Sequence, residues 1–121
     1  MPDKVKKYKV IREYISPYPD PIIFYRGDIV EVGEEFKDDP DWKGWVWCVS
    51  KHDQQAWVPK QFLEMDGKKG VFIRDYNAME LSVFVGEELL VSEIVNGFGL
   101  GNRSNGLRGW VPMKNLELVE L

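Results

Sequence analysis

Few side chains in this sequence could do acid–base or nucleophilic chemistry, and they are scattered. The single cysteine, Cys48, lies among aromatic and β-branched residues without a cationic residue directly beside it, which is typical of a buried, inert thiol. The single histidine, His52, lies in a polar segment and lacks the partners that a metal site or a catalytic pair requires. Gly97, Gly99 and Gly101 are followed by neither Lys-Ser/Thr nor a helix, so they do not indicate a phosphate loop. We therefore expect no catalytic residues, no metal and no cofactor.

Aromatic side chains give a stronger chemical signal. Trp42, Trp45 and Trp47 lie close together, and the alternation of a β-strand places Trp45 and Trp47 on the face opposite Val46 and Cys48. Large aromatic side chains on an exposed face often mark a binding surface, so we predict such a surface with Trp45 as its anchor. The alternative is that the tryptophans fill a small core or support its edge.

The composition excludes several classes of protein. The chain has 121 residues, of which 44% are hydrophobic and 30% charged, as in a folded globular protein. A net charge of −4 argues against nucleic acid and anionic membranes as partners. The polar start of the chain does not resemble a signal peptide, and no apolar run approaches the ~18 residues of a membrane span. We expect a cytoplasmic protein without an internal disulfide.

The residue pattern predicts strands and no helices. Short runs rich in aromatic and β-branched residues alternate with Gly-, Pro- and Asp-rich turns, and no segment has sustained helical periodicity. The first half contains the predicted strands 8–12, 22–25, 29–32, 44–49 and 57–58. We therefore expect an all-β fold.

The second half repeats the order of the first. Ala56-Trp57-Val58-Pro59 occurs again as Gly109-Trp110-Val111-Pro112, and each copy is followed by a Leu-Glu pair. The turn at Gly27-Asp28 corresponds to Gly86-Glu87. Differences in length fall in the predicted loops, as expected of duplicated modules. We expect two domains, residues 1–66 and 67–121, joined by a short charged linker.

Each repeat resembles a Src homology 3 (SH3) domain, a small five-stranded barrel, and is most similar to the bacterial variants of that family. The opening Ala-Leu-Tyr-Asp-Tyr strand of the family is matched by residues 10–14 and 72–76. Its Glu-Leu-Ser-Phe-x-x-Gly-Asp motif is matched by residues 80–87 and, more weakly, by 21–28. Its central Trp and core Ala fall on Trp45 and Cys48. The resemblance implies two tandem SH3-like barrels.

The resemblance also implies an aromatic groove that binds an extended or Pro-rich peptide, since a polyproline helix is already stiff and loses little entropy on docking. Four residues of the first repeat fall on the groove positions: Tyr14, Trp45, Pro59 and Phe62. Nearby carboxylates that would meet a basic ligand residue are Asp20, Asp38, Asp39 and Asp41, although the acidic run is also typical of a solvated loop. The second repeat keeps only Tyr76, Phe98 and Pro112, with Asn115 in place of the groove Tyr, so its groove is expected to be degraded.

The sequence thus favours a non-enzymatic protein-interaction module whose first repeat carries the working groove. The partner is expected to be a protein or peptide. One alternative is a structural or oligomerisation unit whose aromatic faces meet each other. Recognition of nucleic acid or of cell-wall peptide is a further alternative, which the negative charge and the lack of an export signal argue against.

Overall fold

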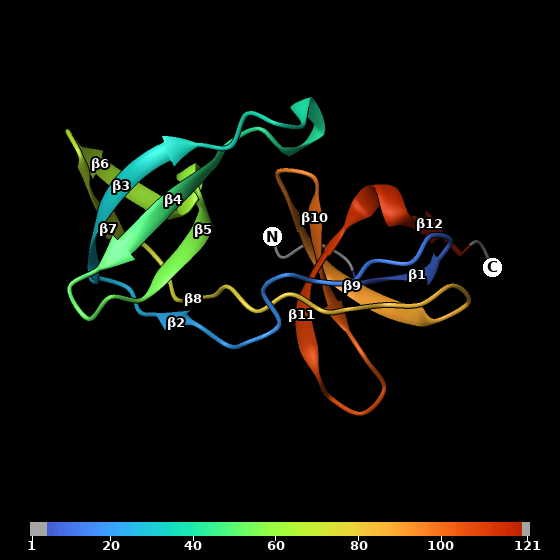
Figure 1. The fold of residues 1–121 in the computed structure, drawn as a ribbon. Helices are drawn as coiled ribbons and strands as arrows, with labels where there is room; N and C mark the ends of the chain where they lie inside the picture. The colour runs from blue at the N-terminus through green and yellow to red at the C-terminus, as the bar shows by residue number, and fades with distance from the viewer. Residues whose placement is uncertain (1–4, 120–121) are drawn as a thin grey trace. The chain divides into compact units, whose positions relative to one another are not determined.

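The computed structural model describes residues 5–119 and confirms the expected all-β class (Figure 1). Two five-stranded antiparallel sheets account for most of the regular structure, as expected of SH3-like small barrels. The helical segments in the described range are single 3₁₀ turns, and none of them is long enough to cross a membrane. By contacts the chain forms two units, of which unit 1 contains residues 5–20 and 79–119 and unit 2 contains residues 21–78.

Unit 2 is built on the sheet order β5-β4-β3-β7-β6, accompanied by the short pair β2-β8. Its elements are β2 (Ile23–Phe24), β3 (Ile29–Glu35), η1 (Pro40–Trp42), β4 (Trp45–Ser50), β5 (Gln55–Pro59), η2 (Lys60–Phe62), β6 (Leu63–Asp66), β7 (Lys69–Phe72) and β8 (Tyr76–Asn77). The expected turn at Gly27 is confirmed, with a φ of 95° that a residue without Cβ adopts at no steric cost. The core includes Phe24, Val30, Val58 and Phe72.

Unit 1 has the equivalent order β11-β10-β9-β1-β12. Its elements are β1 (Lys6–Val10), β9 (Glu88–Val95), β10 (Phe98–Asn102), β11 (Arg108–Pro112), η3 (Met113–Asn115) and β12 (Leu116–Leu118). Seven buried residues form its core: Val10, Leu81, Val83, Leu89, Val91, Val111 and Leu116. The two sheets therefore repeat one architecture, as the repeated sequence predicts.

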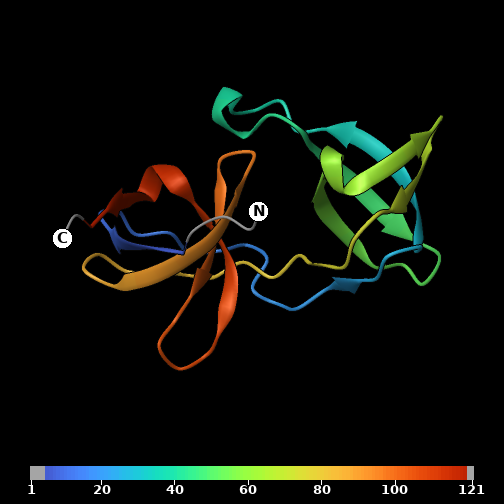
Figure 2. The same cartoon turned by 180° about the vertical axis from the view of Figure 1, so that it is seen from behind.

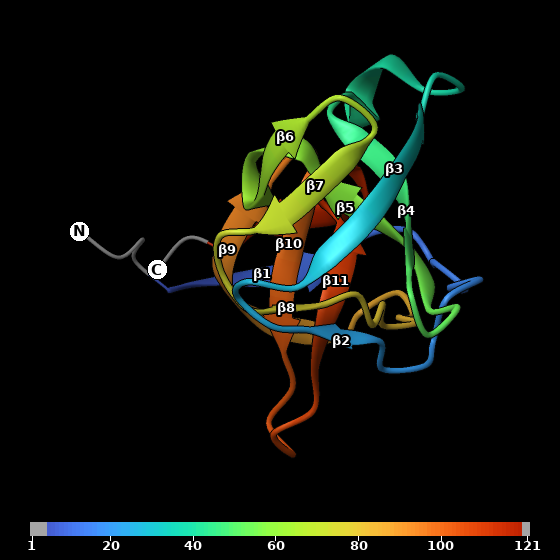
Figure 3. The same ribbon diagram turned by 90° about the vertical axis from the view of Figure 1, so that its left-hand side faces the viewer.

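The two repeats have exchanged their first strands. Strand β1 belongs to the first sequence repeat but lies between β9 and β12 of the second (Figure 2). Strand β7 belongs to the second repeat but lies between β3 and β6 of the first (Figure 3). The expected boundary between residues 66 and 67 separates the sequence repeats, whereas the structural units are divided after residues 20 and 78.

Side-chain volume gives a physical reason for the exchange. Tyr8 of β1 and Gly70 of β7 occupy equivalent places, opposite Leu89 in unit 1 and opposite Val30 in unit 2. A Cβ on Gly70 would lie 3.1 Å from Val32 and 3.3 Å from Leu63, so unit 2 has no room there for a tyrosine ring. Close packing makes such volume mismatches costly, which disfavours β1 in unit 2.

The third strand of each unit compensates for this difference in volume. In unit 1, β10 carries Gly99 and Gly101 where β4 of unit 2 carries Val46 and Cys48. The unit with the large first-strand residue thus has the small third-strand residues, and the unit with Gly70 has the larger ones. Each first strand is matched to the sheet that it joins.

Candidate functional site

The groove residues expected in the first repeat are not brought together as one exposed surface. Trp45, Pro59 and Phe62 belong to unit 2 and are buried, with only 6% of Trp45 and 4% of Phe62 exposed. Tyr14 belongs to unit 1, because the strand that precedes it is exchanged. The expectation that Trp45 has an exposed ring is therefore wrong. Alternation predicts which side chains share a face, but not whether the loops at a strand end cover that face.

In unit 2 the place equivalent to Tyr14 is taken by Tyr76. Its ring meets Phe62 edge-on with centroids 5.4 Å apart, and its hydroxyl donates a hydrogen bond of 2.8 Å to the carbonyl oxygen of Trp57. Phe24 and Phe72 stack with centroids 4.7 Å apart, and the guanidinium of Arg74 lies 4.2 Å from the Phe62 ring centroid. The four aromatic rings belong to the buried core of unit 2, and the Arg74 side chain lies over the Phe62 ring.

Tyr14 takes part in a polar cluster of unit 1. Its hydroxyl donates to Glu80 Oε1 at 2.6 Å, and the hydroxyl of Ser16 donates to the same oxygen at 3.0 Å. Burial raises the pKa of Glu80, an effect that these two hydrogen bonds oppose. Burial and the bond to Glu80 also raise the pKa of Tyr14. The cluster fixes the segment 14–18 against 80–83, where Tyr14 also pairs with Val83.

The second repeat has no exposed groove at the expected positions. Phe98 and Pro112 are buried and face each other across β10 and β11. Asn115, which stands in place of the groove tyrosine, is buried, and its amide donates to the carbonyl oxygens of Arg12 and Glu13 at 3.2 and 3.1 Å. The degraded groove positions thus contribute to the core and to anchoring the segment that follows β1.

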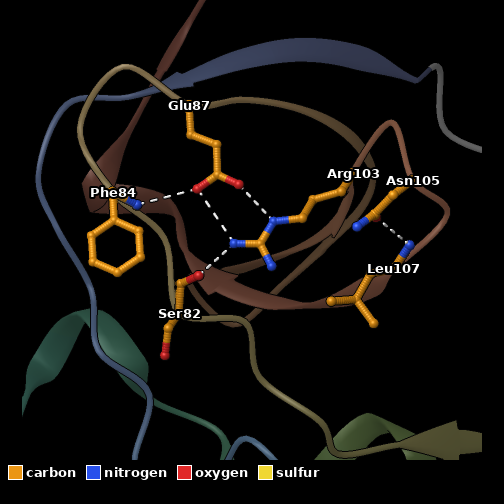
Figure 4. A network of polar contacts seen from close by, with 6 residues as sticks. All are labelled: Ser82, Phe84, Glu87, Arg103, Asn105 and Leu107. Atoms are coloured by element: carbon orange, nitrogen blue, oxygen red, sulfur yellow. Dashed lines mark hydrogen bonds and ion pairs between the residues drawn. The ribbon is translucent and has the colours of Figure 1, made fainter.

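A polar network in unit 1 is also structural. Figure 4 shows Arg103 donating from Nε to Glu87 Oε1 at 2.6 Å and from a terminal nitrogen to the carbonyl oxygen of Ser82 at 2.6 Å. Glu87 in turn accepts from the amide of Phe84, and the bond to Arg103 lowers the pKa of Glu87. The network joins the turn at 84–87 to the segment after β10.

Four aromatic side chains at the surface of unit 2 form a continuous row. We call Trp42, Phe36, Trp57 and Trp47 the aromatic row; all four are half-buried. Successive ring centroids are 5.9 Å, 5.3 Å and 5.1 Å apart, and the last two contacts are edge-to-face. Trp47 and Trp57 are directly opposite each other on β4 and β5. The row runs from the loop before β4 onto the outer face of the sheet.

The end of the row at Trp47 adjoins a shallow hollow of about 260 Å³. Gly33 leaves space beside Trp47, and Val49, Lys68 and Lys69 contribute to the walls. Glu31 also lines the hollow, so the aromatic row continues into a depression with apolar, cationic and acidic residues.

The predicted acidic residues fall around the aromatic row only in part. Asp38 and Asp39 lie in the same loop as Phe36 and Trp42, and the amide of Trp42 donates to the carbonyl oxygen of Asp39 at 3.0 Å. The side chain of Asp41 lies outside the described part of the structure, and Asp20 belongs to unit 1. Glu35 forms an ion pair with Lys60, which lowers the pKa of Glu35.

Trp57 and Phe36 are the residues that the sequence reasoning missed. The signal for Trp57 was present, because it alternates with Ala56 and Val58 and pairs with Trp47 once the turn at 51–54 closes the hairpin. Phe36 lies just beyond β3 in a loop, where no periodicity indicates a face. Cys48 is fully buried as expected, and burial raises its pKa to about 12, which favours the unreactive thiol over the thiolate.

The two five-stranded antiparallel sheets are consistent with SH3-like small β-barrel domains. Among the described side chains of residues 5–119, which exclude that of Asp41, no group of three His, Cys, Asp or Glu could hold a metal ion. The family model described as Variant SH3 domain matches residues 7–76, which is more than half of the chain. The chain belongs to this family, whose members are typically non-catalytic modules that bind proteins or peptides. No curated protein matches the chain in sequence.

The matched range begins in β1 and ends in β8, so it includes most of one strand of unit 1 and the strands of unit 2 from β2 to β7. The match therefore includes β1, which precedes unit 2 in the sequence but pairs with the strands of unit 1. Residues 77–121 lie outside it.

Proposed function

We propose that this protein is a non-enzymatic interaction module that binds an extended or Pro-rich segment of another protein through the aromatic row of unit 2. The observation that carries the proposal is the half-exposed run of four rings with successive centroids between 5.1 and 5.9 Å. Flat rings pack on proline rings, and a polyproline helix loses little conformational entropy when it docks. The proposed site lies in the unit that contains Trp45, but the contact residues are those of the aromatic row in place of the buried Trp45.

The buried residues of the expected groove have a supporting role in this proposal. Trp45 opens β4 opposite Pro59, and Trp47 follows it two positions later in the same strand. Phe62 contacts Tyr76, which holds the backbone of Trp57 through its hydroxyl. These residues fix the strands from which Trp47 and Trp57 project. Tyr14 belongs to unit 1 and is not one of the four residues of the aromatic row.

The carboxylates of the loop before β4 supply a second element of recognition. Asp38 is exposed, and Asp39 is half-buried next to the turn that carries Trp42. A basic residue of the bound segment would reach them while the apolar part lies on the rings, as charge complementarity favours. We retain Asp39 and Asp41 as predicted contacts on this basis.

The test is a binding titration with an array of Pro-rich and other extended peptides, read out by tryptophan fluorescence. Trp57→Ala and Trp47→Ala should each weaken binding by about 2 kcal/mol, or roughly thirtyfold, because truncation of an aromatic anchor has that typical cost. The matched control is Phe84→Ala, which removes a ring that is 54% exposed in unit 1. If Phe84→Ala weakens binding while both tryptophan variants bind normally, the aromatic row is not the site.

A second candidate function is self-association through strand β1, which differs from the expected oligomerisation through aromatic faces.

A further inference from the structure

We propose that the N-terminal arm, residues 5–20, is an exchangeable strand that can complete unit 1 of a second copy of this chain. Reciprocal exchange of two arms would give a dimer with the same strand contacts as the monomer. This proposal goes beyond peptide binding by unit 2 and does not depend on it.

The arm supplies a central part of unit 1. Strand β1 lies between β9 and β12, with Tyr8 opposite Leu89 and Leu118. Val10 is fully buried in the unit's core. Beyond the strand, Asn115 binds two backbone carbonyl groups of the arm. These contacts are all made with residues of the segment 79–119, so that segment is incomplete without an arm.

The acceptor segment would expose two strand edges without the arm. Both β9 and β12 pair with β1, so its departure would leave their backbone groups unpaired and uncover Leu89 and Leu116. Unpaired edges of this kind readily accept a strand from another chain. The acceptor also recognises the arm by charge, because Lys9 lies opposite Glu88 on one side and Glu117 on the other. The strand that fits best is therefore another copy of the arm.

The last residues of the arm and its junction with unit 2 are exposed and contain Pro17, Pro19 and Pro21. The arm's own hydrogen bonds reach as far as Tyr18, which is held by Ser16 and Glu80. Pro19 and Pro21 have no amide hydrogen to pair, and each fixes its own φ. A proline biases the residue before it toward extended backbone, so this connection tends to be extended, and it is the hinge at which two copies would exchange their arms.

The protein concentration determines whether the arm pairs within its own chain or with a second copy. An arm tethered to its own acceptor has an effective concentration in the millimolar range, so the monomer prevails in dilute solution. Exchange should therefore appear when chains refold at a protein concentration that approaches this range. It should also appear whenever a chain's own arm or its own acceptor is damaged.

The experiment mixes two full-length variants, each damaged on one side. Val10→Asp places a charge in the unit 1 core and disables the arm, whereas Leu89→Asp disables the acceptor. Each variant alone should lose the NMR signals of unit 1. An equimolar mixture should give a species of twice the monomer mass by light scattering, in which unit 1 signals return, since one intact arm meets one intact acceptor.

The matched control is Ile11→Asp, which alters a side chain of the arm that is 48% exposed. This variant should keep unit 1 folded by itself and form no complex with Leu89→Asp in dilute solution. A second measurement needs no variant: the unmodified chain refolded at ~1 mM should contain a twofold-mass species that is absent after refolding at ~10 µM. If the mixed variants stay monomeric and refolding at high concentration yields monomer alone, the arm is not exchangeable.

Discussion

The exchange of first strands predicts which fragments of the chain fold. Residues 21–78 contain every strand of unit 2, whereas residues 1–66 follow the sequence repeat and lack β7 and β8. We expect the fragment 21–78 to fold by itself and the fragment 1–66 to remain unfolded. The two fragments are of similar length, so a difference between them reports strand pairing.

The size of the effect follows from the rings that are lost. Phe72 stacks on Phe24 at a centroid distance of 4.7 Å, and Tyr76 contacts Phe62 at 5.4 Å. Truncation of one buried aromatic residue costs about 3–5 kcal/mol, so loss of both exceeds ~6 kcal/mol, which equals the whole stability of many small domains. Strand β1 cannot replace β7 in the fragment, because Tyr8 would occupy the place where even a Cβ is crowded.

The assay is thermal unfolding monitored by circular dichroism, together with the dispersion of NMR chemical shifts at low temperature. The fragment 21–78 should unfold cooperatively, and the same fragment with Phe72→Ala should lose that transition, as a control for the contribution of β7. If 1–66 unfolds cooperatively at the midpoint of 21–78, the first strand pairs within its own repeat and the exchanged topology is refuted.

The remaining predictions concern packing and protonation. Gly70→Ala should lower the free energy of unfolding by about 1–3 kcal/mol through overpacking. The Cβ of Gly33→Ala would meet nothing closer than 3.4 Å, so this variant should be neutral or stabilising by ~0.4–1 kcal/mol. Denaturant titrations of the two variants measure both effects. Cys48 should react with a thiol reagent only as fast as the protein unfolds, and rapid labelling under native conditions would contradict this. Burial raises the pKa of Glu80, so the folded state binds its proton more tightly than the unfolded state. The free energy of unfolding should therefore fall, relative to Glu80→Gln, as the pH rises above about 4.3, the ordinary pKa of the group; parallel curves for the two proteins would exclude this linkage.

The sequence was sufficient for the parts of the fold that depend on local patterns. The strand that contains Val46, Cys48 and Val49 was recognisable from its β-branched and aromatic residues, and β4 covers it as Trp45–Ser50. The turns at Gly27 and Gly86 were predictable because each needs a positive φ, which is 95° and 93° in the structure. The repeated order of motifs predicted two equivalent sheets, which the strand orders confirm.

The sequence predicted an aromatic surface as the candidate site, but it did not predict which aromatic residues form that surface. Aromatic residues between 42 and 57 do form a surface, but Trp45 is buried while Trp57 and Phe36 join the row. The alternation of a strand assigns a side chain to one of two faces. Whether loops and neighbouring strands cover that face depends on residues distant in the sequence.

By itself the sequence determined the all-β class, the positions of most strands and turns, and the repeat, because each depends on the conformational preferences of a few adjacent residues. The expected charged linker between the repeats is instead the hairpin of β6 and β7, whose pairing the local pattern did not predict. Only the tertiary structure decided which sheet each first strand joins. Both repeats offer a place for it, and long segments after β1 and β7 permit either choice. The choice depends on whether Tyr8 or Gly70 fills a given space, and that space is defined by strands from elsewhere in the chain. The same choice places Tyr14 in unit 1 and Tyr76 in unit 2, and so decides which rings can share a site.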